Sequence, residues 1–182
     1  MAQKSILFKK IFPYSEIPKI EFNNIQLPME IPKDIWITDT TFRDGQQSMS
    51  SMTVEQMVKI YDYLHELDNG SGVIRQTEFF LYSDKDREAL RRCMAKGYDF
   101  PQITSWIRAS EEDFKLVKEM GVKETGILMS CSDYHIFHKL NLTRKEAMDT
   151  YISIARAALE NGIIPRGHFE DITRADFFGF VA

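Results

Sequence analysis

The sequence predicts an α/β fold in which about five parallel β-strands alternate with helices as an incomplete (β/α)₈ barrel. Two observations lead to this prediction. Apolar runs alternate with patterns of helical spacing, and one strand with its helix takes roughly 30 residues. Polar side chains follow one strand after another, as they do where the strand ends of a barrel share one mouth.

Five short runs carry the strand signal. They are residues 34–39, 73–80, 100–107, 124–130 and 163–170. Between them lie four helical segments, each preceded by a residue whose side chain can cap the helix. The predicted caps are Thr53, Ser83, Ser110 and Thr143, and the helices are expected to end near Gly70, Lys96, Gly121 and Glu160.

Residues 1–33 differ from the rest because they carry four of the six prolines. Proline fixes φ and lacks the N–H group that regular elements use, so this segment is typical of an extended lead-in. We therefore expect a proline-rich lead-in over residues 1–33 and the N-terminal portion of a barrel domain over residues 34–182.

Composition argues against several classes of protein. The 182 residues are 43% hydrophobic with a net charge of −4, which suits a globular domain and not a nucleic-acid surface. No apolar run approaches the ~20 residues of a membrane helix, and the N-terminus lacks the apolar core of a secretory signal. Cys93 and Cys131 fit no zinc or redox spacing, so a cytoplasmic protein is expected.

Two architectures compete for this alternation. A doubly wound open sheet can be complete with five strands, whereas a (β/α)₈ barrel needs eight. Polar residues at successive strand ends favour the barrel, because an open sheet concentrates its site at one switch point. No G-x-G-x-x-G turn follows the first strand, which weakens a dinucleotide-binding interpretation. The polar residues are Arg43, Asp44, Glu78, Ser105, Ser130, Ser132, Asp133, His135, His168, Glu170 and Asp171.

The densest polar cluster is DTTFRDGQQS, residues 39–48. Within it, Asp44 offers an oxygen ligand for Mg²⁺ or Mn²⁺, and Arg43 offers a planar cation for a carboxylate or a developing enolate oxygen. Gln47 can donate to or accept from a bound acid. The residues alone leave a second interpretation open, in which Arg43 and Asp44 are only a solvated loop pair.

This cluster resembles the first-strand signature Asp-x-Thr-x-Arg-Asp-Gly-x-Gln of the HMGL-like family of metal-dependent TIM barrels. That family includes 2-isopropylmalate, homocitrate and citramalate synthases, 3-hydroxy-3-methylglutaryl-CoA lyase and the carboxyltransferase domain of pyruvate carboxylase. Residues 129–148, MSCSDYHIFHKLNLTRKEAM, resemble its fourth-strand pattern, and residues 168–181, HFEDITRADFFGFV, resemble its fifth-strand pattern.

The resemblance implies roles for five residues. Arg43 would polarise a carbonyl and stabilise an enolate, and Asp44 would be one metal ligand. Gln47 would lie near the substrate acid, Glu170 would face the substrate, and His135 would belong to the substrate-binding group. The resemblance also implies a divalent metal, Mg²⁺ or Mn²⁺ with Zn²⁺ as a further option, and a 2-oxo acid and an acyl-CoA as substrates.

The sequence also departs from the family. The family completes its metal site with a His-x-His pair that this sequence lacks, so weak metal binding by this chain alone is expected. The Gly-Gln-Gln ending also differs from the Gly-Glu-Gln of the synthases. The leading interpretation is condensation of acetyl-CoA with a 2-oxo acid, and the alternative is a lyase or a carboxyltransferase. A truncated, non-catalytic fragment that needs a partner chain is a third interpretation, and open barrel edges predict a homo-oligomer.

Other polar and aromatic residues have ordinary interpretations. Glu78 is either a site acid or the partner of Arg75 or Lys85. His168 is expected to be a hydrogen-bonded residue of the barrel. The aromatic stripe within residues 177–180 is expected to be a buried helix face.

Overall fold

The structure, a computed structural model, describes residues 21–22, 24–26 and 32–182. The contacts between residues divide the chain into two units, Met1–Ile31 and Pro32–Ala182. In the first unit, β1 (Glu21–Phe22) pairs antiparallel with β2 (Ile25–Gln26). The predicted proline-rich lead-in lies mostly outside the described residues and stays a prediction.

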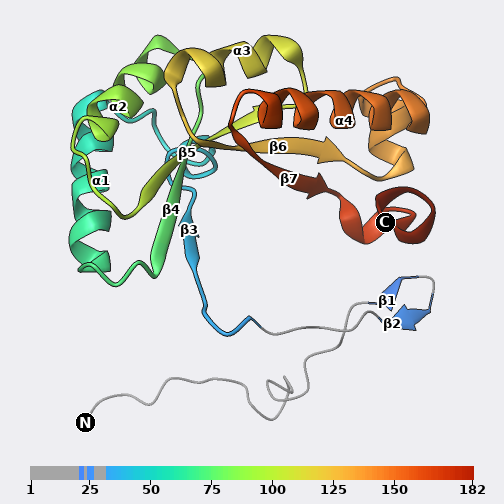
Figure 1. Cartoon of the computed structure of the whole chain (residues 1–182), viewed down its shortest axis with the longest axis horizontal. Helices are drawn as coiled ribbons and strands as arrows, with labels where there is room; N and C mark the ends of the chain where they lie inside the picture. The colour runs from blue at the N-terminus through green and yellow to red at the C-terminus, as the bar shows by residue number, and fades with distance from the viewer. Residues whose placement is uncertain (1–20, 23, 27–31) are drawn as a thin grey trace. The chain divides into compact units, whose positions relative to one another are not determined.

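The second unit contains one sheet of five parallel strands in the order β3-β4-β5-β6-β7. The strands are β3 (Ile37–Asp39), β4 (Ile74–Phe79), β5 (Gln102–Arg108), β6 (Glu124–Ser130) and β7 (Ile164–Glu170). Neighbouring strands are consecutive in the chain, so the order has no reversal of the kind that an open doubly wound sheet contains. The sheet curls into half of a barrel, which confirms the predicted fold class (Figure 1).

Four helices lie along the outer side of the curled sheet (Figure 1). They are α1 (Val54–Asp68), α2 (Asp84–Met94), α3 (Glu111–Met120) and α4 (Arg144–Glu160). At each predicted cap the side chain accepts a hydrogen bond from the N–H group three residues on, so all four helix starts are confirmed. Within the described residues, no helix combines the length and the apolar character needed to cross a bilayer.

The first strand is shorter than predicted. Only Ile37–Asp39 pairs with β4, whereas residues 34–36 lie outside the sheet. The cause is that β3 has a single neighbour among the described strands and that Ile35 is 74% exposed, so no second surface holds this run in the sheet. The Trp36 ring instead lies against Arg75, whose Cζ is 4.8 Å from the ring centroid.

The structure also differs from the prediction at the end of α2 and in the aromatic stripe. Helix α2 ends at Met94, before the expected Lys96, because the next residues form a turn. The aromatic stripe does not form a buried helix face. Phe177–Val181 is a single wide turn without buried side chains, in which Phe178 is 43% exposed.

The two faces of the sheet differ in chemistry, because successive side chains of a strand point to opposite faces. The outward side chains pack against the helices and form an apolar core, in which Phe79, Ile107 and Ile127 are fully buried. The inward side chains of the concave face are mostly polar or charged. They include Thr38, Gln76, Glu78, Thr104, Trp106, Glu124, Leu128, Ser130, Arg166, His168 and Glu170.

Candidate active site

The loop after β3 carries the first predicted site residues and is anchored by an aromatic contact. Phe42 is fully buried and stacks on Phe79 with ring centroids 4.5 Å apart, a contact that contributes about 1 kcal/mol beyond burial. The Arg43 N–H group then donates to the Thr40 carbonyl oxygen at 3.1 Å. This turn leaves the Arg43 side chain 13% exposed and the neighbouring Asp44 side chain 53% exposed.

Arg43 is held by three groups. Its Nε donates to Glu78 Oε2 at 2.7 Å, and its Nη1 lies 2.6 Å from Asp44 Oδ1. Its Cζ lies 5.2 Å from the centroid of the Trp106 ring, in a cation–π position. Because a guanidinium has five N–H donors, donors remain for a ligand in the cavity.

Glu78 is the buried carboxylate of the site, with its side chain 1% exposed. It pairs with Arg43 on one side and with Arg166 of β7 on the other. The sequence offered Arg75 or Lys85 as its partner, and both predictions were wrong. Alternation along β4 puts Arg75 on the face opposite to Glu78, and Lys85 bonds the loop after β3 instead.

His168 of β7 lies beside this cluster and is uncharged. Arg166 Nε donates to His168 Nε2 at 3.3 Å, so this ring nitrogen accepts a hydrogen bond. The 3.5 Å between His168 Nε2 and Glu78 Oε1 is therefore not an ion pair. Burial lowers the pKa of His168, with help from the nearby arginines and against the effect of Glu78. His168 is a hydrogen-bonded residue of the barrel, as predicted.

Glu170, at the end of β7, is held by neighbours from two other elements. Its Oε2 accepts from Ser130 Oγ at 2.5 Å, and Oε1 and Oε2 accept from Lys139 Nζ at 2.8 and 2.7 Å. His135 Nδ1 lies 3.2 Å from Oε2 without the alignment of a hydrogen bond. Burial works to raise the pKa of Glu170, but the bonds from Lys139 and Ser130 outweigh it and hold the pKa below its usual value.

One cavity of about 450 Å³ brings four of the five predicted site residues together. Its lining residues are Arg43, Asp44, Gln47, Trp106, Leu128, His168, Phe169 and Glu170. His135 does not line this cavity and contacts it through Glu170. Strands β3 and β7 are the two edge strands of the five-stranded sheet, and their carboxyl ends thus face one shared cavity. The chemical roles of these residues stay predictions.

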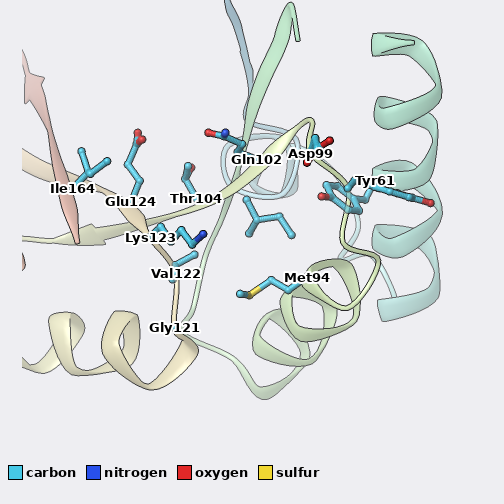
Figure 2. A pocket seen from close by; sticks show the side chains of 12 residues that line it. Tyr61, Met94, Asp99, Gln102, Thr104, Gly121, Val122, Lys123, Glu124 and Ile164 are labelled. Carbon is cyan, nitrogen blue, oxygen red and sulfur yellow. The ribbon is translucent and has the colours of Figure 1, made fainter. Parts of the chain in front are cut away.

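A second cavity, of about 520 Å³, lies at the opposite ends of the strands (Figure 2). Gln102, Glu124 and Ile164, which begin β5, β6 and β7, line it together with Tyr61 and Met94 from two helices. None of the predicted site residues lies there. Because the amino ends of barrel strands serve stability and not catalysis, this cavity is not the candidate active site.

Asp44 only partly fits its predicted role as a metal ligand. Its carboxylate is half-exposed, but one oxygen already pairs with Arg43. In the part of the chain that the structure describes, no three His, Cys, Asp or Glu side chains converge as a metal ion would require. Protein-bound Mg²⁺ commonly uses one or two carboxylates with water and substrate oxygens. Asp44 thus fits one position of such a site, and the described residues do not complete it.

Sequence reasoning missed the contacts that Trp106, Lys139 and Arg166 make in the site. A usable signal existed for Arg166, because Arg166, His168 and Glu170 follow the period of two that places side chains on one face of a strand. Lys139 lies in the turn His135–Lys139, and no periodicity predicts the contacts of a loop residue. Trp106 shares its strand face with Thr104, which the same alternation could have shown.

The fold and the polar mouth together define a barrel protein whose candidate site lies at the carboxyl ends of parallel strands, where such barrels carry their catalytic groups. A family model described as HMGL-like matches residues 34–181. The chain belongs to the HMGL-like family, which confirms the resemblance read from the sequence.

Relatives with known names lie close in sequence. Over 174 residues, 96% of this chain, the identity is 70% to citrate (Re)-synthase of Clostridium kluyveri and 55% to citrate (Re)-synthase of Syntrophus aciditrophicus. The matched parts are 38% and 28% of those relatives, so the chain spans well under half of their length. Hydroxymethylglutaryl-CoA lyase of Pseudomonas aeruginosa has a TM-score of 0.59 at 19% identity, covering 78% of this chain and 47% of that one. This likeness supports the fold.

Proposed function

We propose that this chain carries part of the active site of an enzyme that condenses acetyl-CoA with a 2-oxo acid through an enolate. The observation that carries the proposal is the single cavity lined by Arg43, Asp44, Gln47 and Glu170. The names of the similar proteins direct the choice of the acceptor. Citrate is an acetate unit joined to oxaloacetate, so oxaloacetate is the proposed 2-oxo acid.

The proposed roles follow from the state of each side chain. Arg43 is fixed at the cavity with free donors, so it stabilises negative charge on a carbonyl or enolate oxygen. Glu170 is ionised and therefore accepts a proton or a hydrogen bond from the substrate. Gln47 bonds the carboxylate of the substrate acid, and His135 supports the substrate-binding group from behind Glu170.

Asp44 is proposed as one ligand of a divalent cation, Mg²⁺ or Mn²⁺ with Zn²⁺ as a further option. Binding by this chain alone is weak, because one carboxylate leaves most of the coordination to water. The roles of Arg43 and Glu170 do not depend on the ion. Calorimetric titration of Mn²⁺ should show weak binding that is lost in D44A, and binding that D44A leaves unchanged contradicts this assignment.

Release of CoA tests the condensation. The purified chain receives acetyl-CoA, Mn²⁺ and oxaloacetate, the free thiol is measured by colour, and citrate is identified by mass spectrometry. We expect citrate, and a rate at least about 10²-fold lower in R43K, because the fixed donors to the reacting oxygen move. R91K is the matched control, since Arg91 pairs with half-exposed Glu88 on the helix surface.

The other outcomes separate the alternatives. Cleavage of hydroxymethylglutaryl-CoA without citrate formation favours a lyase, and carboxyl transfer to or from a 2-oxo acid favours a carboxyltransferase. A folded chain that does none of these contradicts condensation by this chain alone and favours a fragment that needs a partner chain.

Self-association and a cytoplasmic location are proposed as well. Cys93 and Cys131 are both free and buried, and burial raises the pKa of the Cys131 thiol to about 11. Two reduced thiols support a reducing compartment.

Self-association is supported by the two open edges of the sheet, β3 and β7, among the strands that the structure describes.

A further inference from the structure

Glu170 is oriented mainly by a turn that lies outside the sheet. The wide turn His135–Lys139 follows β6, and the Leu140 N–H group closes it by donating to the His135 carbonyl oxygen at 2.9 Å. Its second residue, Ile136, is fully buried and anchors the turn to the core. The spacing of four residues brings the side chains of His135 and Lys139 to the same carboxylate.

His135 and Lys139 of this turn contact Glu170 differently. Lys139 Nζ bonds both oxygens, at 2.8 and 2.7 Å, so it fixes the rotation of the carboxylate plane as well as its position. His135 Nδ1 approaches only Oε2, and among the described residues it has no hydrogen-bond partner. Ser130 also bonds only Oε2. Oε1 therefore has Lys139 as its one hydrogen-bonded neighbour among the described residues.

The Cys131 thiol donates to the Glu170 carbonyl oxygen at 3.1 Å and leaves the carboxylate oxygens to other groups. Two further titratable groups nearby are engaged elsewhere. Asp171 pairs with Arg174 at 2.7 Å, and the Tyr151 hydroxyl of α4 donates to the Ser130 carbonyl oxygen at 2.9 Å. Within the described part of the chain, Lys139 is thus the one lysine or arginine paired with Glu170. Contact of one ammonium with both oxygens restrains the carboxylate more than contact with a single oxygen would.

We propose that Lys139 is a positioning residue that clamps both oxygens of Glu170 and aims the carboxylate at the cavity beside Arg43. This inference rests on the proposed role of Glu170 in the condensation. It adds a residue that lies outside the lining of the 450 Å³ cavity and that reaches this cavity through its bonds to Glu170. The turn and the end of β7 then form one unit, so a shift of the turn moves the acid.

The pKa of Glu170 reports this clamp without any need for activity. The purified chain, labelled with ¹³C at glutamate carboxyl carbons, is titrated by NMR, and E170Q assigns the signal. K139M should raise the pKa of Glu170, because the two bonds that favour the ionised form are lost. K139R should keep the pKa low, since a guanidinium also offers paired donors. K145M is the matched control, because Lys145 pairs with Asp149 on the exposed side of α4.

The results are read against the control. A larger upward shift in K139M than in K145M, restored by K139R, supports the proposal. An equal shift in K139M and K145M, or no restoration by K139R, overturns it. K139Q repeats the measurement if K139M does not keep the circular-dichroism spectrum of the parent chain. A chain that shows the shift but never releases CoA contradicts the proposed function and leaves the clamp in place.

Discussion

The carboxylate of Glu78 joins the two edge strands of the half-barrel through their arginines. Arg43 follows β3 and Arg166 lies on β7, and both guanidinium groups pair with this one side chain. Burying a lone carboxylate costs several kcal/mol, which the two cations offset here. Arg43 also lines the candidate cavity, whereas Glu78 does not. The orientation of the Arg43 side chain therefore depends on a buried carboxylate outside that cavity.

Neutralising this carboxylate should destabilise the fold. E78Q keeps the shape of the side chain but leaves Arg43 and Arg166 without their shared anion, and we expect a loss of about 3 kcal/mol in the free energy of unfolding. Urea denaturation followed by circular dichroism measures it.

The matched control for this change is E88Q. Glu88 pairs with Arg91 at 3.6 Å, and both side chains are more than half exposed. Such a pair contributes about 0.5 kcal/mol or less. If E78Q and E88Q unfold at the same urea concentration, then the buried cluster does not hold the two edges together.

For single residues, the sequence predicted which side chains line the site better than it predicted the contacts that these side chains make. The density of DTTFRDGQQS identified Arg43, Asp44 and Gln47, which do line one cavity with Glu170. The partner of Arg43 escaped prediction, because Glu78 lies 35 positions away and pairing at that separation depends on strand register. The register of β4 against β3 is set by the whole sheet, which no local pattern encodes.

Between elements, neighbouring strands approach each other closely on the concave face at Gly126 of β6. A Cβ atom at this position would lie 2.8 Å from Trp106 Cδ1 and 2.8 Å from His168 Nε2, on the two neighbouring strands. These distances are shorter than van der Waals contact, and both neighbours belong to the cluster around Arg43. A side chain at residue 126 would therefore push apart the groups that line the candidate cavity.

We expect G126A to lower the free energy of unfolding by about 1–3 kcal/mol, the usual cost of overpacking a core. Thermal and urea unfolding measure the change. Gly167 is the matched control, because it lies on the adjacent strand opposite Ile127, and a Cβ there would come no closer than 3.4 Å to Met129 Sδ and 3.6 Å to Phe169 Cζ. G167A should be close to neutral, and a loss in G167A as large as in G126A would show that the close approach at Gly126 is not the cause.

The elements themselves were largely predictable, because their signals are local. Thr53 and Thr143 cap their helices as the capping-box pattern requires, each with a glutamine or glutamate three residues on. The length of the first strand was overestimated, because an apolar run forms a strand only where a neighbouring strand pairs with it through hydrogen bonds. Residues 34–36 have no such neighbour in the sheet that the structure describes. Strand propensity therefore set the type of element, and the sheet set its length.

For the second unit as a whole, the two edges of the sheet carry apolar grooves. Along β3, a cavity of about 460 Å³ is lined by Ile37 and by Leu64 and Leu67 of α1. Along β7, a cavity of about 290 Å³ is lined by Phe169 and by Ile152 of α4. In a complete barrel, the next strand and helix pack against such an edge. Among the strands that the structure describes, each edge thus offers both unpaired backbone groups and apolar surface to another chain.

This arrangement predicts self-association of the purified chain at micromolar concentration, which light scattering coupled to size-exclusion chromatography measures. F169K should shift the population towards single chains, because it places a charge on β7, where Phe169 is 48% exposed and lines the apolar groove. L159K is the matched control, since Leu159 is 64% exposed on α4 and lies outside that groove. We expect L159K to associate as the parent chain does. A parent chain that is strictly monomeric, or equal dissociation in F169K and L159K, would show that the open edges do not drive the association.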